Sequence, residues 1–481
     1  MSPGRAPGGE RLGGERLAGE RPGGELTGSD RGSILVVATV ASFLTPFMGS
    51  AVNIALPSIG QEFDMDAVLL SWVATSYLLA AAMFLVPLGR LADLIGRKRV
   101  FLWGMAVITV LTVALGLSVS GWMVVILRFF QGIGAAMIFG TGIALLTAVY
   151  PREQRGTVLG INVAAVYAGL SVGPFLGGAI TELLGWRWVF LSIAPMGLLV
   201  IGLVLWRVKG DLAGSRGERF DLHGTVLYSL AITLVLLGFS TLPGTTGSAL
   251  IAAGCLAAFL FVFWGSWVKH PVLDVNLFRR NRVFAYSNLA ALIHYSATFA
   301  IAFLLSLYLQ YVKGMSPQDA GAVILVQPFM MMLFSPLTGR LSDLVEPRVV
   351  ATIGMTITTA GLAGLAFLRA DTDIWLIIWA LTVIGIGYAF FSSPNTNAVM
   401  SSVDARTYGV ASGTVGTMRL LGQVFSMGIA TVLFAVLIGR EQIVPSLHDE
   451  FMTAVNVAFA IFTVLCLLGI PASMARGSLR D

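Results

Sequence analysis

Three ionisable side chains, Arg128, His294 and Arg419, lie deep inside long apolar runs of the sequence. Burying an ionisable group in an apolar medium is costly, so such groups usually face a polar seam and serve a function. A guanidinium stays charged and can hold an anion, whereas an imidazole can bind and release a proton near neutral pH. We therefore expect both arginines to face a cavity or a polar seam. For His294, a proton-binding site and a hydrogen-bonded structural role are equally open.

Amide side chains accompany these groups at helical spacing. Gln131 follows Arg128 by three residues and Gln423 follows Arg419 by four, so each pair shares a helical face. The predicted cavity residues are the polar or ionisable groups within the apolar runs, namely Asn53, Arg128, Gln131, His294, Gln327, Asn395, Asn397, Arg419 and Gln423.

The amides Asn395 and Asn397 allow a second interpretation, because Pro394 precedes them. A proline inside a helix frees a backbone carbonyl group, and a nearby polar side chain can satisfy it. These two residues therefore either face the cavity or hydrogen-bond the backbone.

The runs that hold these residues are long and apolar enough to cross a bilayer as helices. Hydrophobic residues make up 56% of the chain and charged residues 11%, whereas a soluble domain is roughly a quarter charged. This composition excludes a soluble enzyme, a nucleic-acid-binding protein and a disordered scaffold. It predicts an all-α integral membrane protein with fourteen spans, at residues 33–56, 68–88, 100–120, 122–149, 156–181, 188–206, 223–242, 248–268, 283–310, 321–338, 349–368, 374–400, 409–438 and 451–473.

The basic residues indicate how the spans are oriented. Lys and Arg concentrate in every second loop, on the side that also carries both ends of the chain. Because basic loops stay in the cytoplasm, we expect both termini there. Residues 1–32 repeat Gly, Glu and Arg without apolar periodicity, which predicts a disordered cytoplasmic tail.

Two motifs recur about 250 residues apart. The sequence GRLAD at 89–93 returns as GRLSD at 339–343, and glycines 132 and 134 return as glycines 385 and 387. Parallel repeats of six spans are typical of transporters that move one half against the other. We predict six-helix bundles at 33–208 and 273–473, two inserted helices at 209–272, and a cytoplasmic C-terminus at 474–481.

Several segments together carry a family resemblance: GRLADLIGRKR at 89–99, LRFFQGIG at 127–134, GLSVGPFLGG at 169–178, GWRWVF at 185–190 and SPNTN at 393–397. With the six, two and six spans, they resemble the major facilitator superfamily, specifically its 14-span drug:proton antiporter family 2. The resemblance covers residues 33–473. It implies two pseudo-symmetric bundles, the cytoplasmic membrane of a prokaryote, and proton-coupled multidrug efflux of small amphipathic compounds by alternating access.

The resemblance also implies a conformational latch in the two repeated loops, in which carboxylates pair across the bundles in one state and release in the other. Alternatively, the basic side chains only fix the topology and contact anionic membrane lipid. The latch residues would be Gly89, Arg90, Asp93, Gly96, Arg97, Arg99, Gly339, Arg340 and Asp343.

The fifth span carries a stripe of small residues, which lets two helices approach closely. In the resembling family this stripe marks exporters and seals the cavity in one state, although tight packing alone is the alternative. The predicted hinge consists of Gly169, Gly173, Pro174, Gly177 and Gly178.

Carboxylates are missing from the middle of the spans. All 25 lie in a tail, a loop or a span end, with Glu182 nearest to a buried position, and Met48 stands where the family usually has an aspartate. If protons are used, His294 or Glu182 must carry them. Because the fixed charge within the membrane is positive, we expect neutral or anionic substrates.

Alternatives to multidrug efflux are export of an endogenous metabolite or a lipid, and a membrane sensor that transports nothing. An enzyme is disfavoured, because the sequence has no nucleophile elbow, metal-ligand cluster or phosphate-cradling loop. We expect a monomer that uses no cofactor, no metal and no nucleic acid, and whose partners are a small-molecule substrate, membrane lipid and a coupling ion, H⁺.

Overall fold

The computed structural model describes residues 28–150, 152–207, 221–268, 271, 275–403 and 408–477. Within these residues every regular element is helical, and fourteen segments are long and apolar enough to cross a membrane. The predicted all-α class and the number of spans are therefore confirmed. The first half contains α1 (Gly28–Glu62), α2 (Ala67–Ile95), α3 (Arg97–Gly116), α4 (Gly121–Val149), α5 (Arg152–Leu184), α6 (Arg187–Leu191) and α7 (Ala194–Arg207).

The inserted pair consists of α8 (Leu222–Ser240) and α9 (Thr245–Gly265), and the short helix α10 (Val275–Arg280) follows it. The second half contains α11 (Arg282–Thr298), α12 (Ile301–Leu307), a π-helical turn (Tyr308–Val312), α13 (Pro317–Ile324), α14 (Val326–Leu344), α15 (Pro347–Leu365), α16 (Ile374–Ser401), α17 (Tyr408–Leu437) and, after a 3-10 turn (Pro445–Leu447), α18 (His448–Met474).

Helix α1 begins before the predicted start of the first span. Residues 28–32, expected in the disordered tail, are helical, whereas residues 1–27 lie outside the described residues. An apolar helix can continue into polar sequence because its backbone hydrogen bonds do not depend on side-chain hydropathy.

Some spans predicted as continuous are broken. Between α11 and α12 the helix is interrupted, and the backbone N–H of Ala300 donates to Ser426 Oγ of α17 at 3.0 Å. A broken helix is tolerated within a membrane where another group satisfies the freed backbone atoms. This break therefore depends on a side chain from a distant helix.

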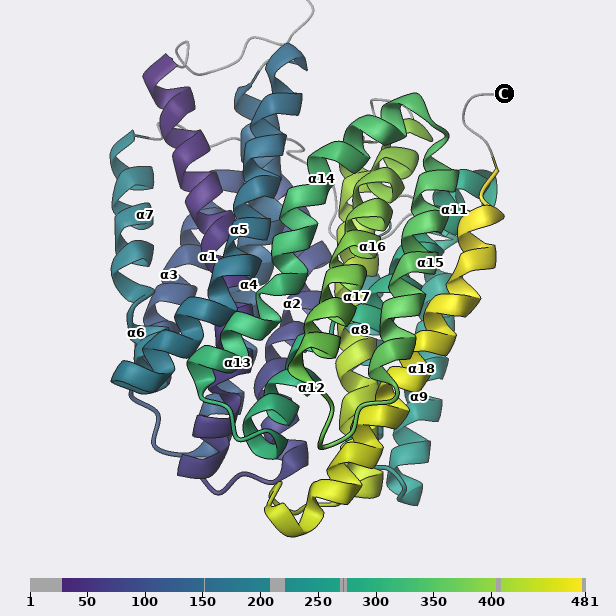
Figure 1. Cartoon of the computed structure of the whole chain (residues 1–481). Coiled ribbons are helices and arrows are strands. Elements are labelled where there is room, and N and C mark those ends of the chain that lie inside the picture. The colour runs from purple at the N-terminus through teal and green to yellow at the C-terminus, as the bar shows by residue number, and fades with distance from the viewer. Residues whose placement is uncertain are drawn as a thin grey trace, which may run out of the picture.

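The helices pack into two bundles that meet along two seams (Figure 1). Within the first half α1 packs against α5 and α2 against α4, and within the second half α15 packs against α16 and α11 against α17. Between the halves, α2 contacts α17, and α5 contacts α13 and α14. The inserted helix α8 touches both α2 and α17, so it covers one seam.

We call the side where α1 begins and α18 ends the tail side, uppermost in Figure 1, and the opposite side the far side.

The internal repeat is visible as a repeated helix contact. A Cβ atom on Gly132 of α4 would clash with the backbone carbonyl of Tyr77 of α2. A Cβ atom on Gly385 of α16 would clash in the same way with the carbonyl of Gln327 of α14. The two contacts lie about 250 residues apart, as the repeated motifs do, which supports a duplication.

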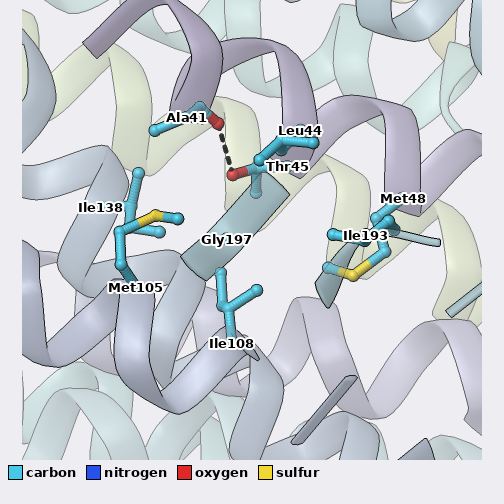
Figure 2. Close-up of a pocket in the computed structure, with 9 residues that line it drawn as sticks. All are labelled: Ala41, Leu44, Thr45, Met48, Met105, Ile108, Ile138, Ile193 and Gly197. Atoms are coloured by element: carbon cyan, nitrogen blue, oxygen red, sulfur yellow. Dashed lines mark hydrogen bonds between the residues drawn. The ribbon is translucent and has the colours of Figure 1, made fainter. Parts of the chain in front are cut away.

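One small apolar pocket lies inside the first half, between α1, α3, α4 and the α6–α7 segment (Figure 2). It is lined by Ala41, Leu44, Thr45, Met48, Met105, Ile108, Ile138, Ile193 and Gly197. The only hydroxyl group in this lining, Thr45 Oγ1, donates back to the carbonyl of Ala41 at 3.0 Å. Met48, at the position where the resembling family usually has an aspartate, therefore lines an apolar pocket.

Candidate functional site

The two halves are joined by hydrogen bonds on the far side. Ser306 Oγ of α12 donates to the carbonyl of Asn53 of α1 at 2.7 Å, and Gln310 Nε2 donates to the next carbonyl, that of Ile54, at 3.0 Å. On the second seam, Ser71 of α2 shares a 3.0 Å hydrogen bond with Thr431 of α17. These contacts hold α1 and α2 against the second half.

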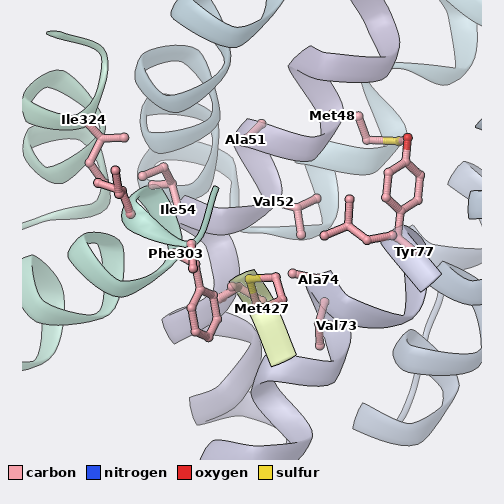
Figure 3. Packing of buried hydrophobic residues seen from close by; sticks show 14 of the residues in the cluster. Met48, Ala51, Val52, Ile54, Val73, Ala74, Tyr77, Phe303, Ile324 and Met427 are labelled. Carbon is pink, nitrogen blue, oxygen red and sulfur yellow. The ribbon is translucent and has the colours of Figure 1, made fainter. Parts of the chain in front are cut away.

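Apolar side chains from both halves fill the same region (Figure 3). Phe303 of α12 and Met427 of α17 lie beside Ile54 of α1 and Val73 of α2, in one continuous core cluster. Phe303 and Ile54 are fully buried. Water on the far side is therefore excluded from the space between the bundles at this level.

The backbones of α5 and α13, which belong to different halves, approach each other closely. A Cβ atom on Gly178 would clash with the carbonyl of Pro317, and one on Gly321 would clash with the carbonyl of Pro174. Glu182 Oε2, at the exposed end of α5, accepts a hydrogen bond from the backbone N–H of Gln318 at 3.2 Å. Only glycine lets the two backbones come this close.

The other glycines of the predicted hinge face the first half itself. Cβ atoms on Gly169 and Gly173 would clash with α1, and one on Gly177 would lie 2.6 Å from the Cβ atom of Ala51. The stripe thus has two faces. Gly169, Gly173 and Gly177 pack α5 against α1 of the same half, whereas Gly178 and Pro174 pack α5 against α13 of the other half. Tight packing is therefore shown for the stripe, and a seal that opens and closes at Gly178 stays a prediction.

A group of polar aromatic side chains lies between the halves, on the tail side of these contacts. Tyr167 of α5 and Tyr295 of α11 each place their hydroxyl group 3.4 Å from Ser392 Oγ of α16. The ring of Tyr388 lies 5.7 Å from that of Tyr295, centroid to centroid. We call these four residues the tyrosine cluster, which sits roughly 15–25 Å from the tail-side ends of its helices at 1.5 Å per residue.

Arg419 lies beside the tyrosine cluster. Its guanidinium carbon is 6.0 Å from the ring centroid of Phe139 on α4, across the seam, and α17 packs against the cluster at Gly422, where a Cβ atom would lie 2.6 Å from the Cβ atom of Tyr295. The side chain is half-buried. No carboxylate in the described part of the chain pairs with it. Gln423, one turn further along α17, is also half-buried.

Arg128 has a different environment, although the sequence treats the two arginines alike. It is fully buried within the first half, with Nε donating to the carbonyl of Val73 at 3.2 Å and Nη1 donating to Gln131 Oε1 at 2.7 Å. Gln131 in turn donates to Thr112 Oγ1 at 2.9 Å, and the guanidinium lies 4.2 Å from the ring centroid of Tyr77. The structure therefore places Arg128 and Gln131 in a polar seam between α2, α3 and α4, outside the tyrosine cluster.

His294 is buried behind the tyrosine cluster. Its ring stacks on Phe391 with centroids 4.0 Å apart and faces the edge of Tyr388 at 5.0 Å. Nε2 lies 3.4 Å from Thr358 Oγ1, whereas the buried Nδ1 has no hydrogen-bond partner. The histidine is thus enclosed by helices of the second half and does not line the space between the halves.

Two predicted cavity amides lie away from the tyrosine cluster, which corrects their placement. Asn395 Oδ1 accepts a hydrogen bond from Arg476 Nη1 at 3.0 Å. Asn397 Nδ2 donates to Ser342 Oγ at 3.0 Å and to Asp343 Oδ1 at 3.2 Å. Both amides hold tail-side segments of the second half together. Asn395 lies two turns beyond Tyr388 along α16, closer to the tail-side end of the helix than the cluster.

Asn53 and Gln327 are both buried, and neither belongs to the tyrosine cluster as described. Asn53 lies at the far-side contact with Ser306, and the backbone of Gln327 packs against Gly385 of α16. Of the nine predicted cavity residues, the structure therefore places Arg419 next to the cluster and Gln423 one turn away on the same helix.

The sequence did not mark the tyrosines and Phe139 as site residues, because Tyr167, Tyr295 and Tyr388 resemble ordinary apolar residues of a span. A tyrosine hydroxyl group in an apolar run does need a partner when buried. That requirement is the signal that could have found them.

Arg476 was predicted to lie in the cytoplasmic C-terminus, but it is buried just beyond α18. Its Nε donates to the carbonyl of Ser473 at 2.7 Å, and Nη2 donates to the hydroxyl of the same residue. Burial lowers the pKa of Arg476 to about 10, while the charge of Glu346 opposes that shift. The side chain therefore stays charged at neutral pH and anchors α18 to α16.

Replacing Arg476 with leucine should destabilise the protein by about 1–3 kcal/mol, because Asn395 Oδ1 would be left buried without a donor and Ser473 Oγ would keep only the hydrogen bond from Thr352. The measurement is the thermal unfolding temperature of the purified protein in detergent. The same replacement at Arg440, which is exposed on the far side, is the control. Equal unfolding temperatures for the two variants would contradict an anchoring role.

The described residues hold no group of three or more His, Cys, Asp or Glu side chains that could bind a metal ion. The arrangement found instead is two bundles closed on the far side, with aromatic, hydroxyl and guanidinium groups between them.

The family model of the Major Facilitator Superfamily matches residues 38–427 and 287–476. The chain belongs to this superfamily. The resemblance seen in the sequence motifs is thereby confirmed, and the protein is a multi-pass membrane transporter of this family.

Two curated relatives show which transporters the chain is similar to. It is 28% identical over 437 residues to the riboflavin transporter RibZ of Clostridioides difficile (strain 630), covering 91% of this chain and 95% of the relative. It is 31% identical over 455 residues to the cephamycin export protein CmcT of Amycolatopsis lactamdurans, covering 92% and 93%. The similarity to an antibiotic exporter agrees with a multidrug-efflux-like member of the superfamily.

A solved structure shares the fold. The inward-facing, unoccupied bacterial homolog of the human lysosomal transporter Spinster superposes with a TM-score of 0.69 at 15% identity, covering 94% of this chain and 97% of that one.

The predicted superfamily latch is only partly within the described residues. Gly96, with φ at +121°, joins α2 to α3 in a conformation that favours glycine, and Gly89 packs close to Gly140 of α4. In the second loop Asp343 accepts the hydrogen bond from Asn397. The side chain of Asp93 lies outside the described residues, so pairing across the halves stays a prediction.

Proposed function

We propose that this transporter exports small amphipathic compounds by alternating access, with the tail side in the cytoplasm. The observation that supports it is the closure of the far side at α5–α13 and α1–α12, while the tyrosine cluster and Arg419 lie between the halves nearer the tail side. With the tail side in the cytoplasm, the positive-inside rule is satisfied. The conformation is then one that takes up substrate from the cell interior.

Proton coupling is proposed from the family resemblance, and two side chains are its candidates. Glu182 is exposed at the far-side contact, whereas His294 is buried against Phe391 with one ring nitrogen unpartnered. A buried histidine titrates only if a conformational change gives it access to water. We propose that His294 carries the coupling proton in a conformation that exposes its ring to water.

The test is uptake of dyes into inside-out membrane vesicles with an imposed pH gradient. We expect uptake that needs the protein and the gradient, and a pH optimum that disappears in the variant His294→Gln. Vesicles without the protein and vesicles with a collapsed gradient are the controls. Binding of the dyes without uptake would contradict transport and favour a membrane sensor.

Transport of a metabolite is the second candidate, because the chain aligns with the riboflavin transporter RibZ over nearly the whole length of both proteins. The same vesicles distinguish the candidates when riboflavin is offered beside unrelated dyes. Uptake of riboflavin alone would favour a dedicated metabolite transporter, and uptake of several unrelated compounds would favour multidrug efflux.

A further inference from the structure

We propose that the tyrosine cluster, Phe139 and Arg419 form a substrate site for planar aromatic compounds that carry a negative charge. This inference rests on the proposed transport function and names the class of compound that the site selects.

The site is built by both halves of the molecule. Phe139 and Tyr167 come from α4 and α5 of the first half, whereas Tyr295, Tyr388 and Arg419 come from α11, α16 and α17 of the second. The hydroxyl group of Tyr167 reaches Ser392 across the seam at 3.4 Å. A compound held here touches both halves, which is where a transported substrate must bind if one half moves against the other.

Several side chains of the site are only partly covered by the protein. Phe139, Tyr167, Tyr388 and Arg419 are each half-buried, although their neighbours on the same helices, such as Ala389 and Leu420, are buried. Because Phe139 and Arg419 face each other from opposite halves, the surface they leave uncovered borders the space between the bundles. The far-side contacts close that space at one end.

The chemistry of these groups suits an aromatic ring with hydrogen-bond acceptors. Aromatic side chains bind planar rings by offset stacking or by edge-to-face contact. The hydroxyl groups of Tyr167, Tyr295 and Ser392 can each rotate to donate to a ligand oxygen. Neither observation decides the charge of the ligand.

Arg419 determines which charge on the ligand the site prefers. A ring of tyrosines alone attracts cations, but a permanent guanidinium at the same place repels them. Arg419 forms no ion pair with a carboxylate in the part of the chain that the structure describes, in contrast to Arg187, whose Nη2 lies 2.6 Å from Glu62 Oε1. A guanidinium in an environment of low dielectric is compensated best by an anionic group of the ligand.

The experiment measures equilibrium binding of three xanthene dyes to the purified full-length protein in lipid nanodiscs, by fluorescence anisotropy. The dyes share one planar scaffold and are anionic (fluorescein), neutral (a fluorescein ester without ionised groups) or cationic (rhodamine 123). We expect the anionic dye to bind about tenfold or more tightly than the cationic dye, since a hydrogen bond to a charged group contributes roughly 10- to 100-fold.

Two variants assign the preference to named groups. Arg419→Gln should remove the preference for the anionic dye, and Arg419→Lys should restore part of it. Tyr388→Leu should weaken all three dyes by about tenfold, because it removes stacking and leaves the charge unchanged. The control Arg440→Gln changes an exposed arginine on the far side and should leave all affinities unaltered.

Each outcome is decisive. Equal affinities for the three dyes, a preference for the cation, no binding of any dye, or an anion preference that survives in Arg419→Gln would overturn the proposed selectivity. Uptake in vesicles is a separate measurement. Active uptake of cations only would overturn the inference while supporting transport, whereas selective binding of the anion without uptake would support the site and contradict export.

Discussion

Replacing Gly178 with valine should leave the protein folded but hold its far side open, and transport should fall about fivefold or more. The side chain would clash with the backbone carbonyl of Pro317 on α13 only when the two halves are closed on the far side. Overpacking of this kind costs about 1–3 kcal/mol. Because the cost falls on one conformation, it shifts the equilibrium toward the other by the corresponding factor of about 5–150.

Distances between spin labels across the far side measure this shift directly. Asp64 and Gln442 belong to opposite halves, and Gln442 Nε2 lies 3.4 Å from Asp64 Oδ1. With both replaced by labelled cysteines, and the exposed Cys255 replaced by serine, Gly178→Val should add a population at longer distance. An unchanged distance distribution would show that this crossing does not control the far side.

Two other glycines provide matched controls. A Cβ atom on Gly177 meets Ala51 of the same half, so Gly177→Val should lower the unfolding temperature without changing the spin-label distances. A Cβ atom on Gly202 of α7 would meet nothing within 4 Å, so Gly202→Val should alter neither measurement. The three variants together separate the stability of a bundle from the equilibrium between conformations.

Replacing Arg419 with alanine should abolish transport while the protein stays folded. Arg419 is half-buried and forms no ion pair with the described residues, so its removal leaves no buried acid without a partner. Transport is lost because the substrate or the conformation that requires the positive charge no longer has it. Uptake into vesicles measures the loss of transport, and the thermal unfolding temperature in detergent shows whether the protein stays folded. Unimpaired uptake would remove Arg419 from the substrate site.

Arg128 is the contrasting variant. Arg128→Ala would leave the buried Gln131 Oε1 without its donor and Tyr77 without its cation, so we expect a loss of stability of about 1–3 kcal/mol. Arg419→Lys keeps the charge and should recover part of the uptake. If Arg128→Ala and Arg419→Ala destabilised the protein equally, the distinction between a structural and a substrate-binding arginine would fail.

Hydropathy was sufficient to predict the all-helical class and the number of spans. The fourteen spans follow from the length of apolar sequence that a bilayer requires. The repeat predicted from GRLAD and GRLSD agrees with equivalent glycine contacts at Gly132 and Gly385. These properties are local, because each depends on a segment of about 20 residues and on the membrane as a common solvent.

Only the tertiary structure decided which polar residues share a site. Arg128 and Arg419 look alike in the sequence, each with a glutamine one turn away, yet one is enclosed by its own bundle and the other faces the opposite half. Asn395 was predicted to face the cavity or to hydrogen-bond the backbone, and it instead accepts a hydrogen bond from Arg476, which was predicted to lie in the C-terminal segment beyond the last span. The physical reason is that the spacing of residues determines which of them share a helical face. The helix that covers this face comes from a distant part of the chain, and the sequence of an apolar helix carries no pattern that identifies its packing partner.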